Sequence, residues 1–401
     1  MESDPRSGSP RLLVLGGGPA QLGLLEAGRR RGLWVAVVDR DPGAPGFRFA
    51  DRRCILSTED EPAIERLLGA LEIDGIVSPG TDWPVGVAAR IAERAGLPHP
   101  IAPQTAVLAT NKLRQRERLA ERGVPQPRYW VIGGEDAPPE VDGPVVVKAP
   151  DRQGQKGLTL VEDPRELPAA IETARSAARN GLALVEELVD GPEVTVVGFS
   201  SRGDFTALAV TDRLVASPPA FGVALAHVWP SEVPDTSEVS DTVSRAVEAL
   251  GIENGPSYTQ VRVGSGGPQV IEVAARLGGG HDAELVETVT GVDLNGLAID
   301  AALGLEPQVP PVEPLVGGAV TRFLVAPPGL LERVEVPDGL ENVRIYREPG
   351  YVFTPLRRGA DRAGAVLATG ASRAEALARA DAAADRIRFV TADAGNLVET
   401  R

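Results

Sequence analysis

Several residue types are scarce in this chain of 401 residues, and each scarcity excludes a class of protein. A single cysteine, Cys54, excludes an internal disulfide and suits a reducing compartment, and its neighbours suggest a buried strand position rather than a nucleophile. No apolar run reaches the roughly 18 residues of a transmembrane helix, and glycine and proline interrupt the first one, so we expect no membrane anchor or signal peptide. The net charge of −15 argues against nucleic acid or an anionic membrane as partner. We therefore expect a soluble, cytoplasmic protein.

Lysine is also scarce: Lys112, Lys148 and Lys156 are the three lysines among the 41 basic residues, and all the others are arginines. Lys148 ends an apolar run, and the loop 151–157 that follows contains two glycines and Lys156. A lysine that leaves a strand beside a glycine loop can bind phosphates while the loop closes over them. The loop lacks the pattern G-x-x-x-x-G-K-[ST], which excludes a P-loop. A hairpin with solvated lysines is the alternative that this segment alone leaves open.

The first hundred residues alternate predicted strands with predicted helices. Residues 11–15 read as a strand that enters a glycine turn, and residues 34–39 read as a second strand that ends in Asp39. Residues 74–98 repeat the order of strand, turn and helix, which predicts a doubly wound, Rossmann-like α/β domain. Ala20 or Gln21 stands where G-x-G-x-x-G requires glycine, so an NAD oxidoreductase is disfavoured.

Beyond residue 110 the pattern changes to helices between shorter strands. We expect helices at 110–123, 163–181 and 372–389, strands around the loop 151–157 and on both sides of residue 190, and a hairpin within 255–275. Glu272 lies inside an apolar strand, where a carboxylate is costly unless it is paired or binds a cation such as Mg²⁺. Arg276 could reach an anion near the same place.

The order of these features resembles the ATP-grasp superfamily, in particular the carboxylate–amine ligases of its biotin-carboxylase-like branch, which include the L-amino-acid ligases. The segments DRDPGAPGFRFAD, NKLRQRERLAERGVPQP and IEVAARLGGGHD carry the resemblance, which spans residues 11–390. It implies an α/β (α+β) ATP-grasp fold. The expected parts are a disordered leader at 1–10, an N-terminal Rossmann-like domain at 11–110, a central ATP-grasp domain at 111–315 with its lid at about 125–190, and a C-terminal strand-rich subdomain at 316–401.

The resemblance implies an ADP-forming ligase with ATP and Mg²⁺ as cofactors. Such an enzyme activates a small carboxylic acid, for example an amino acid, as an acyl phosphate and couples it to an amine. Its partners would be a small-molecule carboxylate and amine and, by analogy alone, a second copy of the chain. A carboxylase-type or purine-biosynthesis ATP-grasp enzyme and a catalytically impaired nucleotide-binding protein are the alternatives.

Roles follow from the resemblance position by position. Arg276 and Lys148 would be catalytic, and Lys112 and Lys148 would contact the α- and β-phosphates. The other nucleotide-binding positions are Gln153, Gly154, Lys156 and Gly157 in the lid loop, and Glu186, Glu187, Val189 and Glu193 at the adenosine.

The metal and substrate positions depart in part from the family pattern. Glu272 would bind Mg²⁺, but the second carboxylate position is Gln260 and the third metal position is Ala274, which predicts weaker metal binding. Tyr258 stands where related ligases often have histidine. The candidate substrate residues are Asp212, Arg213, His227, Arg276, Gly279 and His281. Structural histidines and a surface ion pair of Asp212 and Arg213 remain the alternatives.

Overall fold

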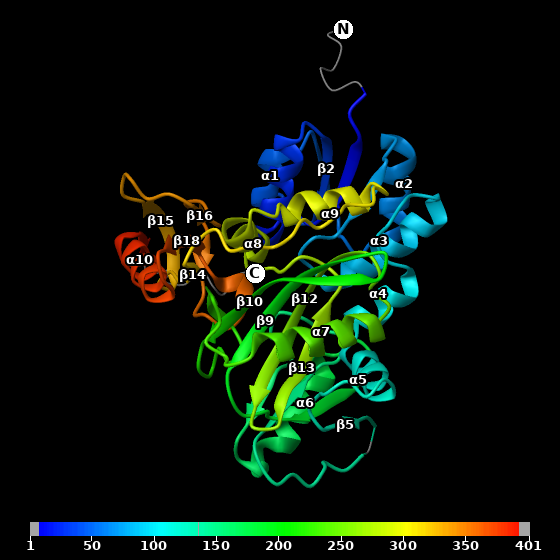
Figure 1. The fold of residues 1–401 in the computed structure, drawn as a ribbon, viewed down its shortest axis with the longest axis vertical. Coiled ribbons are helices and arrows are strands. Elements are labelled where there is room, and N and C mark those ends of the chain that lie inside the picture. The colour runs from blue at the N-terminus through cyan, green and yellow to red at the C-terminus, as the bar shows by residue number, and fades with distance from the viewer. Residues whose placement is uncertain (1–7, 135, 393–401) are drawn as a thin grey trace. The chain divides into compact units, whose positions relative to one another are not determined.

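Residues 8–134 and 136–392 are described by the computed structural model, so most of the expected leader at 1–10 lies outside the described residues. The chain folds into two compact units, each assembled from several segments (Figure 1). Unit 1 comprises the residues up to Gln126, Val194–Val210 and Pro234–Glu313. Unit 2 comprises Pro127–Glu193, Thr211–Val233 and the residues from Pro314 onward. The domain boundaries expected near residues 110 and 315 stay a prediction.

Unit 1 begins with a parallel sheet between helices. Its strands lie in the order β3-β2-β1-β4 and comprise β1 (Arg11–Leu15), β2 (Trp34–Asp39), β3 (Arg52–Ile55) and β4 (Gly75–Val77). The helices are α1 (Leu22–Arg30), α2 (Glu61–Leu71), α3 (Asp82–Ala95), α4 (Pro103–Thr110) and the short helices Pro19–Gln21 and Pro45–Phe49. Apolar side chains of β1 and β2 pack against α3 in a buried core. The predicted Rossmann-like arrangement is confirmed.

The rest of unit 1 is an antiparallel sheet with its own helices. The strands are β12 (Gly255–Gly264), β13 (Gly267–Ala274), β9 (Glu193–Ser201) and β10 (Asp204–Val215), in the order β13-β12-β9-β10. Glu193 of β9 and residues 211–215 of β10 belong to unit 2. The helices are α5 (Lys112–Glu121), α7 (Thr236–Ala249), α8 (Asp282–Thr290) and α9 (Leu294–Ala302). Figure 1 shows α7 along β12 and β13, and α9 beside α1. The predicted hairpin is β12–β13.

Unit 2 contains three groups of strands. The first has the order β5-β8-β6-β7 and comprises β5 (Tyr129–Ile132), β6 (Val145–Lys148), β7 (Thr159–Val161) and β8 (Ala183–Glu187). The second has the order β11-β14-β18-β16 and comprises β11 (Ala224–Trp229), β14 (Gly318–Leu324), β16 (Val343–Ile345) and β18 (Gly364–Gly370). The third has the order β17-β15-β19 and comprises β15 (Gly329–Glu335), β17 (Val352–Phe353) and β19 (Arg388–Ala392).

The helices of unit 2 pack on these strands. They are α6 (Leu167–Ala177), α10 (Arg373–Arg386) and the short helices Pro164–Glu166 and Gly359–Asp361. The prediction that a helix runs on to residue 181 is wrong, because the backbone is already extended at Ala178. Side chains from the loop after β6 end the helix: Arg152 Nε donates to the carbonyl of Ala177, and the Asp151 carboxylate accepts from the amide of Arg179.

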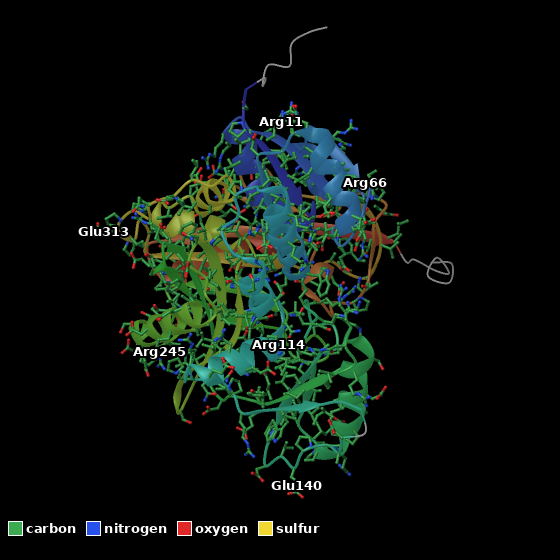
Figure 2. All side chains as sticks on the ribbon, turned by 90° about the vertical axis from the view of Figure 1, so that its right-hand side faces the viewer. Arg11, Arg66, Arg114, Glu140, Arg245 and Glu313 are labelled. Carbon is green, nitrogen blue, oxygen red and sulfur yellow. The ribbon has the colours of Figure 1, made fainter. Side chains whose placement is uncertain are left out.

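Charged side chains cover the outer faces of the helices. Arg66, Arg114 and Arg245 extend outward from α2, α5 and α7 (Figure 2). Across residues 8–134 and 136–392, none of the helices combines the length and the apolar composition needed to cross a bilayer.

Candidate active site

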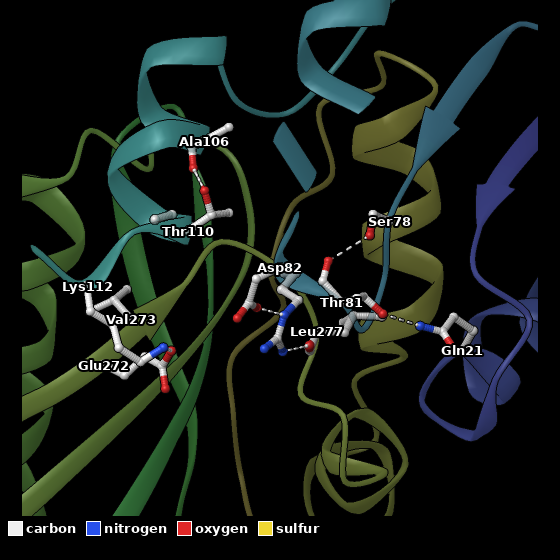
Figure 3. Close-up of polar contacts among 12 residues, drawn as sticks. Gln21, Ser78, Thr81, Asp82, Ala106, Thr110, Lys112, Glu272, Val273 and Leu277 are labelled. Carbon is white, nitrogen blue, oxygen red and sulfur yellow. Dashed lines mark hydrogen bonds and ion pairs between the residues drawn. The ribbon is translucent and has the colours of Figure 1, made fainter. Parts of the chain in front are cut away.

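The first group of predicted site residues surrounds Glu272 in unit 1. Glu272 Oε1 lies 2.6 Å from Lys112 Nζ, and both side chains are mostly buried, with 21% and 11% of their surface exposed (Figure 3). Gln260 in β12 is the cross-strand partner of Glu272 in β13. Directly paired residues project from the same face of a sheet, so an amide and a carboxylate are neighbours here. The charge that the sequence placed inside an apolar strand is therefore balanced by an ammonium group.

Helix α5 brings Lys112 to this carboxylate. Asn111 caps the helix by accepting a hydrogen bond from the amide of Arg114, and Lys112 is its first residue. One turn later, the Gln115 side chain donates to the carbonyl of Val273 and accepts from its amide, at 2.7 and 2.9 Å. The next residue, Arg116, is buried and donates to the carbonyls of Val270 and Ile271. These bonds fix the start of α5 against β13.

Arg276 forms a second ion pair in unit 1. Its Nε lies 2.5 Å from Asp82 Oδ1, and its Nη1 donates to the carbonyl of Leu277 at 2.7 Å. The Tyr258 ring lies 5.9 Å from the guanidinium carbon. Burial lowers the pKa of Arg276, but attraction by Asp82 and the hydrogen bond to it outweigh burial, so the pKa is raised above its ordinary value. Arg276 therefore carries a fixed positive charge.

The segment after Arg276 contains the candidate substrate residues Gly279 and His281. The Asp282 carboxylate, at the start of α8, accepts a hydrogen bond from the amide of Gly280 at 3.0 Å. His281 is buried, adopts φ +60°, and its Nδ1 lies 3.6 Å from Glu284 Oε1. At Gly279 a Cβ would lie 3.6 Å from Ala20 Cβ, an ordinary van der Waals distance, so the space around this position does not require glycine.

In unit 2, Lys148 and Glu186 form a buried ion pair. Glu186 in β8 is paired with Val146 of β6, two residues from Lys148, so both side chains project from the same face. Lys148 Nζ lies 2.5 Å from Glu186 Oε2, with 7% and 2% of the side chains exposed. By contrast, Glu187 is exposed and lies 3.5 Å from Arg128, and Val189 is buried.

The glycine loop 151–157 is attached to unit 2 at several points. Gly157 has φ +71°, and a Cβ there would lie 2.7 Å from Ala177 Cβ, so only glycine fits. Gln155 Nε2 donates to the carbonyl of Gly222 at 3.4 Å, and Gln155 Oε1 accepts from the amide of Gly359 at 3.2 Å. The remaining predicted loop residues Gln153, Gly154 and Lys156 are exposed.

Two neighbouring residues of β10 pair with different partners in unit 2. Arg213 lies 2.6 Å from the carboxylate of Glu193 and donates to the carbonyl of Gly222. Asp212 accepts from Ser231 Oγ at 2.5 Å and lies 2.7 Å from Arg373. The alternative of a surface ion pair between Asp212 and Arg213 is wrong, because both side chains are mostly buried and each pairs elsewhere.

His227 in β11 is buried against an aromatic ring. Its imidazole packs edge to face on Phe323 with the ring centroids 5.7 Å apart, and 2% of the residue is exposed. This surrounding favours the structural alternative for His227. Contact with a substrate stays a prediction for His227, as for the other candidate substrate residues.

Sequence reasoning missed Asp82, Gln155 and Gln115. Asp82 follows β4 as the first residue of α3, and the carboxyl ends of parallel strands are where ligand-binding residues gather in α/β folds. That rule could have singled out Asp82. Nothing in the sequence points to Gln155, because its partners lie 67 and 204 residues away.

Two family models match this chain. Residues 141–284 match the model described as ATP-grasp domain. Residues 322–392 match the model described as L-amino acid ligase C-terminal domain 2.

Curated relatives extend over most of the chain. The uncharacterized protein y4rH of Sinorhizobium fredii is 28% identical over 379 residues, which cover 88% of this chain and 77% of that protein. Formate-dependent phosphoribosylglycinamide formyltransferase of Methylococcus capsulatus is 28% identical over 413 residues, which cover 95% of this chain and 96% of that protein.

Solved structures show the same fold. L-amino acid ligase from Bacillus licheniformis has a TM-score of 0.81 at 23% identity and covers 96% of this chain and 99% of its own. The biotin carboxylase domain of Hydrogenobacter thermophilus 2-oxoglutarate carboxylase, solved with MgADP, ADP and bicarbonate, has a TM-score of 0.78 at 19% identity, with 95% and 90% covered.

These findings confirm the resemblance on which the sequence interpretation rested, and with it the predicted fold class. ATP-grasp enzymes use ATP and Mg²⁺, and structural neighbours contain ADP or MgADP. The chain is an ATP-grasp enzyme of the C–N ligase type, in which an ATP-grasp domain is followed by an L-amino acid ligase C-terminal domain.

Proposed function

We propose that this protein is an ADP-forming carboxylate–amine ligase that activates a small carboxylic acid, such as an amino acid, and joins it to an amine. The match of residues 322–392 to the L-amino acid ligase C-terminal domain carries this proposal. It favours amide formation between two small molecules over the other reactions of ATP-grasp enzymes.

Lys148 and Lys112 would bind the phosphates of ATP. Each has an ammonium group held by one carboxylate, from Glu186 and Glu272, at 2.5 and 2.6 Å. An ammonium group has three N–H donors and attracts phosphate oxygens, and in each pair the carboxylate fixes the direction of the side chain. The loop 151–157, with exposed Lys156 and Gly154, would cover the terminal phosphates.

The adenosine would be bound by the end of β8 and the segment after it. Main-chain groups of Glu186, Glu187 and Val189 would contact adenine, and Glu193 would contact the ribose. Glu193 is held by Arg213 at 2.6 Å, which leaves its second carboxylate oxygen for a hydroxyl group.

Glu272 and Gln260 fit a Mg²⁺ ion that arrives with the nucleotide. Mg²⁺ is usually held by one or two protein oxygens together with substrate phosphates and water. Glu272 and its cross-strand partner supply two adjacent oxygen donors. Within the described part of the chain no cluster of three or more His, Cys, Asp or Glu residues could hold an ion alone, which agrees with such shared coordination. When bound, Mg²⁺ would neutralise the phosphate charge.

In the first step a substrate carboxylate oxygen would attack the γ-phosphorus of ATP, giving an acyl phosphate and ADP. The amine would then attack the acyl carbon, lose a proton and expel phosphate. Both steps develop negative charge that a fixed guanidinium can stabilise, and Arg276 supplies one. The protein's part is positioning and charge neutralisation, which needs no side-chain nucleophile.

A second candidate is activation of formate in a purine-type reaction. The formate-dependent formyltransferase of Methylococcus capsulatus aligns with 95% of the chain, and this observation favours it. A catalytically impaired nucleotide-binding protein is the remaining alternative, and Gln260 and Ala274 at two expected metal positions would explain it. The expectations of a cytoplasmic location and of a homodimer stay predictions.

Purified protein with ATP and Mg²⁺ would test the proposal. ADP and phosphate would be measured against pools of amino acids, other carboxylic acids and amines, with formate plus phosphoribosylglycinamide as a separate arm, and mass spectrometry would identify products. ADP release that needs both a carboxylate and an amine supports the ligase. Release with formate alone among the acids supports the second candidate, and ATP binding without turnover in any arm argues against both.

A further inference from the structure

Asp82 lies at a structurally fixed place in unit 1. It is the first residue of α3, directly after the turn that follows β4. Ser78 Oγ donates to the carbonyl of Thr81 at 2.9 Å, and Gln21 Nε2 donates to Thr81 Oγ1 at 3.0 Å (Figure 3). The turn that carries Asp82 is therefore held from two sides.

The contacts of Arg276 leave one edge of its guanidinium open. An arginine has five N–H donors in a planar fork. Asp82 accepts from Nε, and the carbonyl of Leu277 accepts from Nη1. In residues 8–134 and 136–392 no other hydrogen bond or ion pair of Arg276 is formed. Nη2 and the second N–H of Nη1 therefore form a free pair of donors, the edge that binds an anion with two parallel hydrogen bonds.

The placement of Asp82 decides which edge stays free. A carboxylate on the Nη1–Nη2 edge would block the bidentate position, whereas Asp82 occupies the Nε side. Both side chains are nearly buried, with 13% of Arg276 and 10% of Asp82 exposed. A buried ion pair contributes little net stability, because desolvation of both charges offsets their attraction. The pair therefore contributes more to orientation than to stability.

We propose that Asp82 is the positioning residue for Arg276: it holds Nε so that the Nη1–Nη2 edge faces the anion that forms in the reaction. The identity of that anion rests on the proposed function, whereas the contact between Asp82 and the guanidinium is independent of it.

Kinetics of four variants would test this role. Asp82→Ala should lower kcat by roughly 10- to 100-fold, as removal of the partner that orients a metal ligand typically does, with little change in KM for ATP. Asp82→Asn should retain more activity, because its amide oxygen can still accept from Nε. In an Arg276→Lys background, Asp82→Ala should cause little further loss, because a lysine has no Nε to orient.

The matched control is Glu61→Gln. Glu61 is the first residue of α2, as Asp82 is of α3, and it pairs with Arg90 and Arg94 away from the proposed site. Its kinetics should equal those of the wild type. The proposal is overturned if Asp82→Ala keeps the wild-type kcat, if it raises only the KM of the carboxylate or amine, or if its loss adds in full to that of Arg276→Lys.

A measurement without turnover separates this inference from the proposed function. In protein labelled with ¹⁵N-arginine, the Nε–H signal of Arg276, assigned by its loss in Arg276→Lys, should exchange slowly with water. It should exchange fast in Asp82→Ala and stay slow in Glu61→Gln. Slow exchange in Asp82→Ala would overturn the proposal. If no substrate pool supports turnover but these signals behave as expected, the proposed function fails while the positioning contact stands.

Discussion

Four basic side chains at the candidate site each form an ion pair with a carboxylate. The pairs are Lys112–Glu272, Lys148–Glu186, Arg213–Glu193 and Arg276–Asp82. Pairing lets a cation stay in a poorly solvated place, because the attraction of the carboxylate offsets part of the cost of removing both charges from water. Removing one member of such a pair therefore affects both stability and binding.

Lys148 provides the clearest test of this double effect. Lys148→Ala should abolish turnover and also destabilise the protein by about 3–5 kcal/mol, because it removes the counter-charge of the buried Glu186 carboxylate. The double variant Lys148→Met with Glu186→Gln should recover most of the stability but not the activity. Urea unfolding and ADP release would be measured for both variants. Equal stability of Lys148→Ala and the wild type would contradict the pairing.

Gln260 tests the metal position. Gln260→Glu places a second carboxylate beside Glu272, so we expect Mg²⁺ to be needed at a lower concentration for ADP release, because a charged ligand holds the ion more tightly. Glu272→Gln should shift the Mg²⁺ titration the opposite way. The isosteric change Glu187→Gln, at an exposed residue, is the control. An unchanged titration in Gln260→Glu would place this residue outside the metal site.

The sequence identified charged site residues better than it identified their partners. Glu272 was recognisable because a carboxylate in an apolar strand requires a counter-charge, but the identity of Lys112 as that partner depends on how α5 docks. Asp82 and Arg276 are 194 residues apart. No local pattern relates such residues, because their contact arises only when the chain has folded.

At the scale of elements, the loop 151–157 combines anchored and free positions. Its start ties to the end of α6 through Asp151 and Arg152, whereas Gly154 faces open space. Gln155 links the loop to Gly222 and Gly359 within unit 2. A lid that must open needs weak links, and these two hydrogen bonds, at 3.4 and 3.2 Å, are longer than usual.

The two glycines of this loop should respond differently to substitution. Gly157→Ala should cost more than about 1 kcal/mol, because φ is +71° and the new Cβ would meet Ala177 Cβ at 2.7 Å. Gly154→Ala has a similar φ of +67° but no atom within 4 Å, so it should cost only the backbone strain of about 1 kcal/mol. Thermal unfolding of both variants would compare them. An equal loss would mean that the close contact with α6 does not matter.

Hydrophobic patterning predicted the elements well where one face of each is buried. The parallel strands β1 and β2, the hairpin β12–β13 and most of helix α10 follow from the sequence pattern. The helix expected to reach residue 389 instead ends at Arg386, and β19 begins at Arg388. The end of α6 did not, because helix propensity continues to residue 181 while side chains of Asp151 and Arg152 compete for its last carbonyl and the amides beyond it. Tertiary contacts from a distant segment decided that boundary.

At the scale of the whole molecule, acidic residues set the charge and a partly buried histidine adds a specific pH dependence. The 56 acidic residues give a background of titration below pH 5. His99 in unit 1 is different, because burial lowers its pKa to about 4 despite a hydrogen bond to the carbonyl of Ile101. A cavity of about 240 Å³, lined also by Arg202 and Glu306, lies beside it.

The sign of the histidine effect follows from its lowered pKa. The unfolded chain binds a proton at His99 near pH 6.5, whereas the folded chain does so only near pH 4. The contribution of neutral His99 to the free energy of unfolding is therefore complete above pH 6.5. It is lost as the pH falls from 6.5 to 4, and the loss is at most about 3 kcal/mol. His99→Asn, which keeps a hydrogen-bonding atom, should show a smaller loss over this range in urea unfolding. Parallel curves for both proteins would contradict the prediction.

The bonds between α5 and β13 have one more consequence. β13 is the last strand in its order, so its outer side would present unpaired peptide groups. The Gln115 side chain forms hydrogen bonds with both the amide and the carbonyl of Val273. The Arg116 side chain donates to the carbonyls of Val270 and Ile271. The amide of Val270 donates to the carbonyl of Pro125. Helix α5 and the segment after it thus form hydrogen bonds that a neighbouring strand would otherwise form with β13. An open sheet edge is a template for pairing with strands of other copies, so we expect the side chains that set Lys112 beside Glu272 to limit aggregation as well.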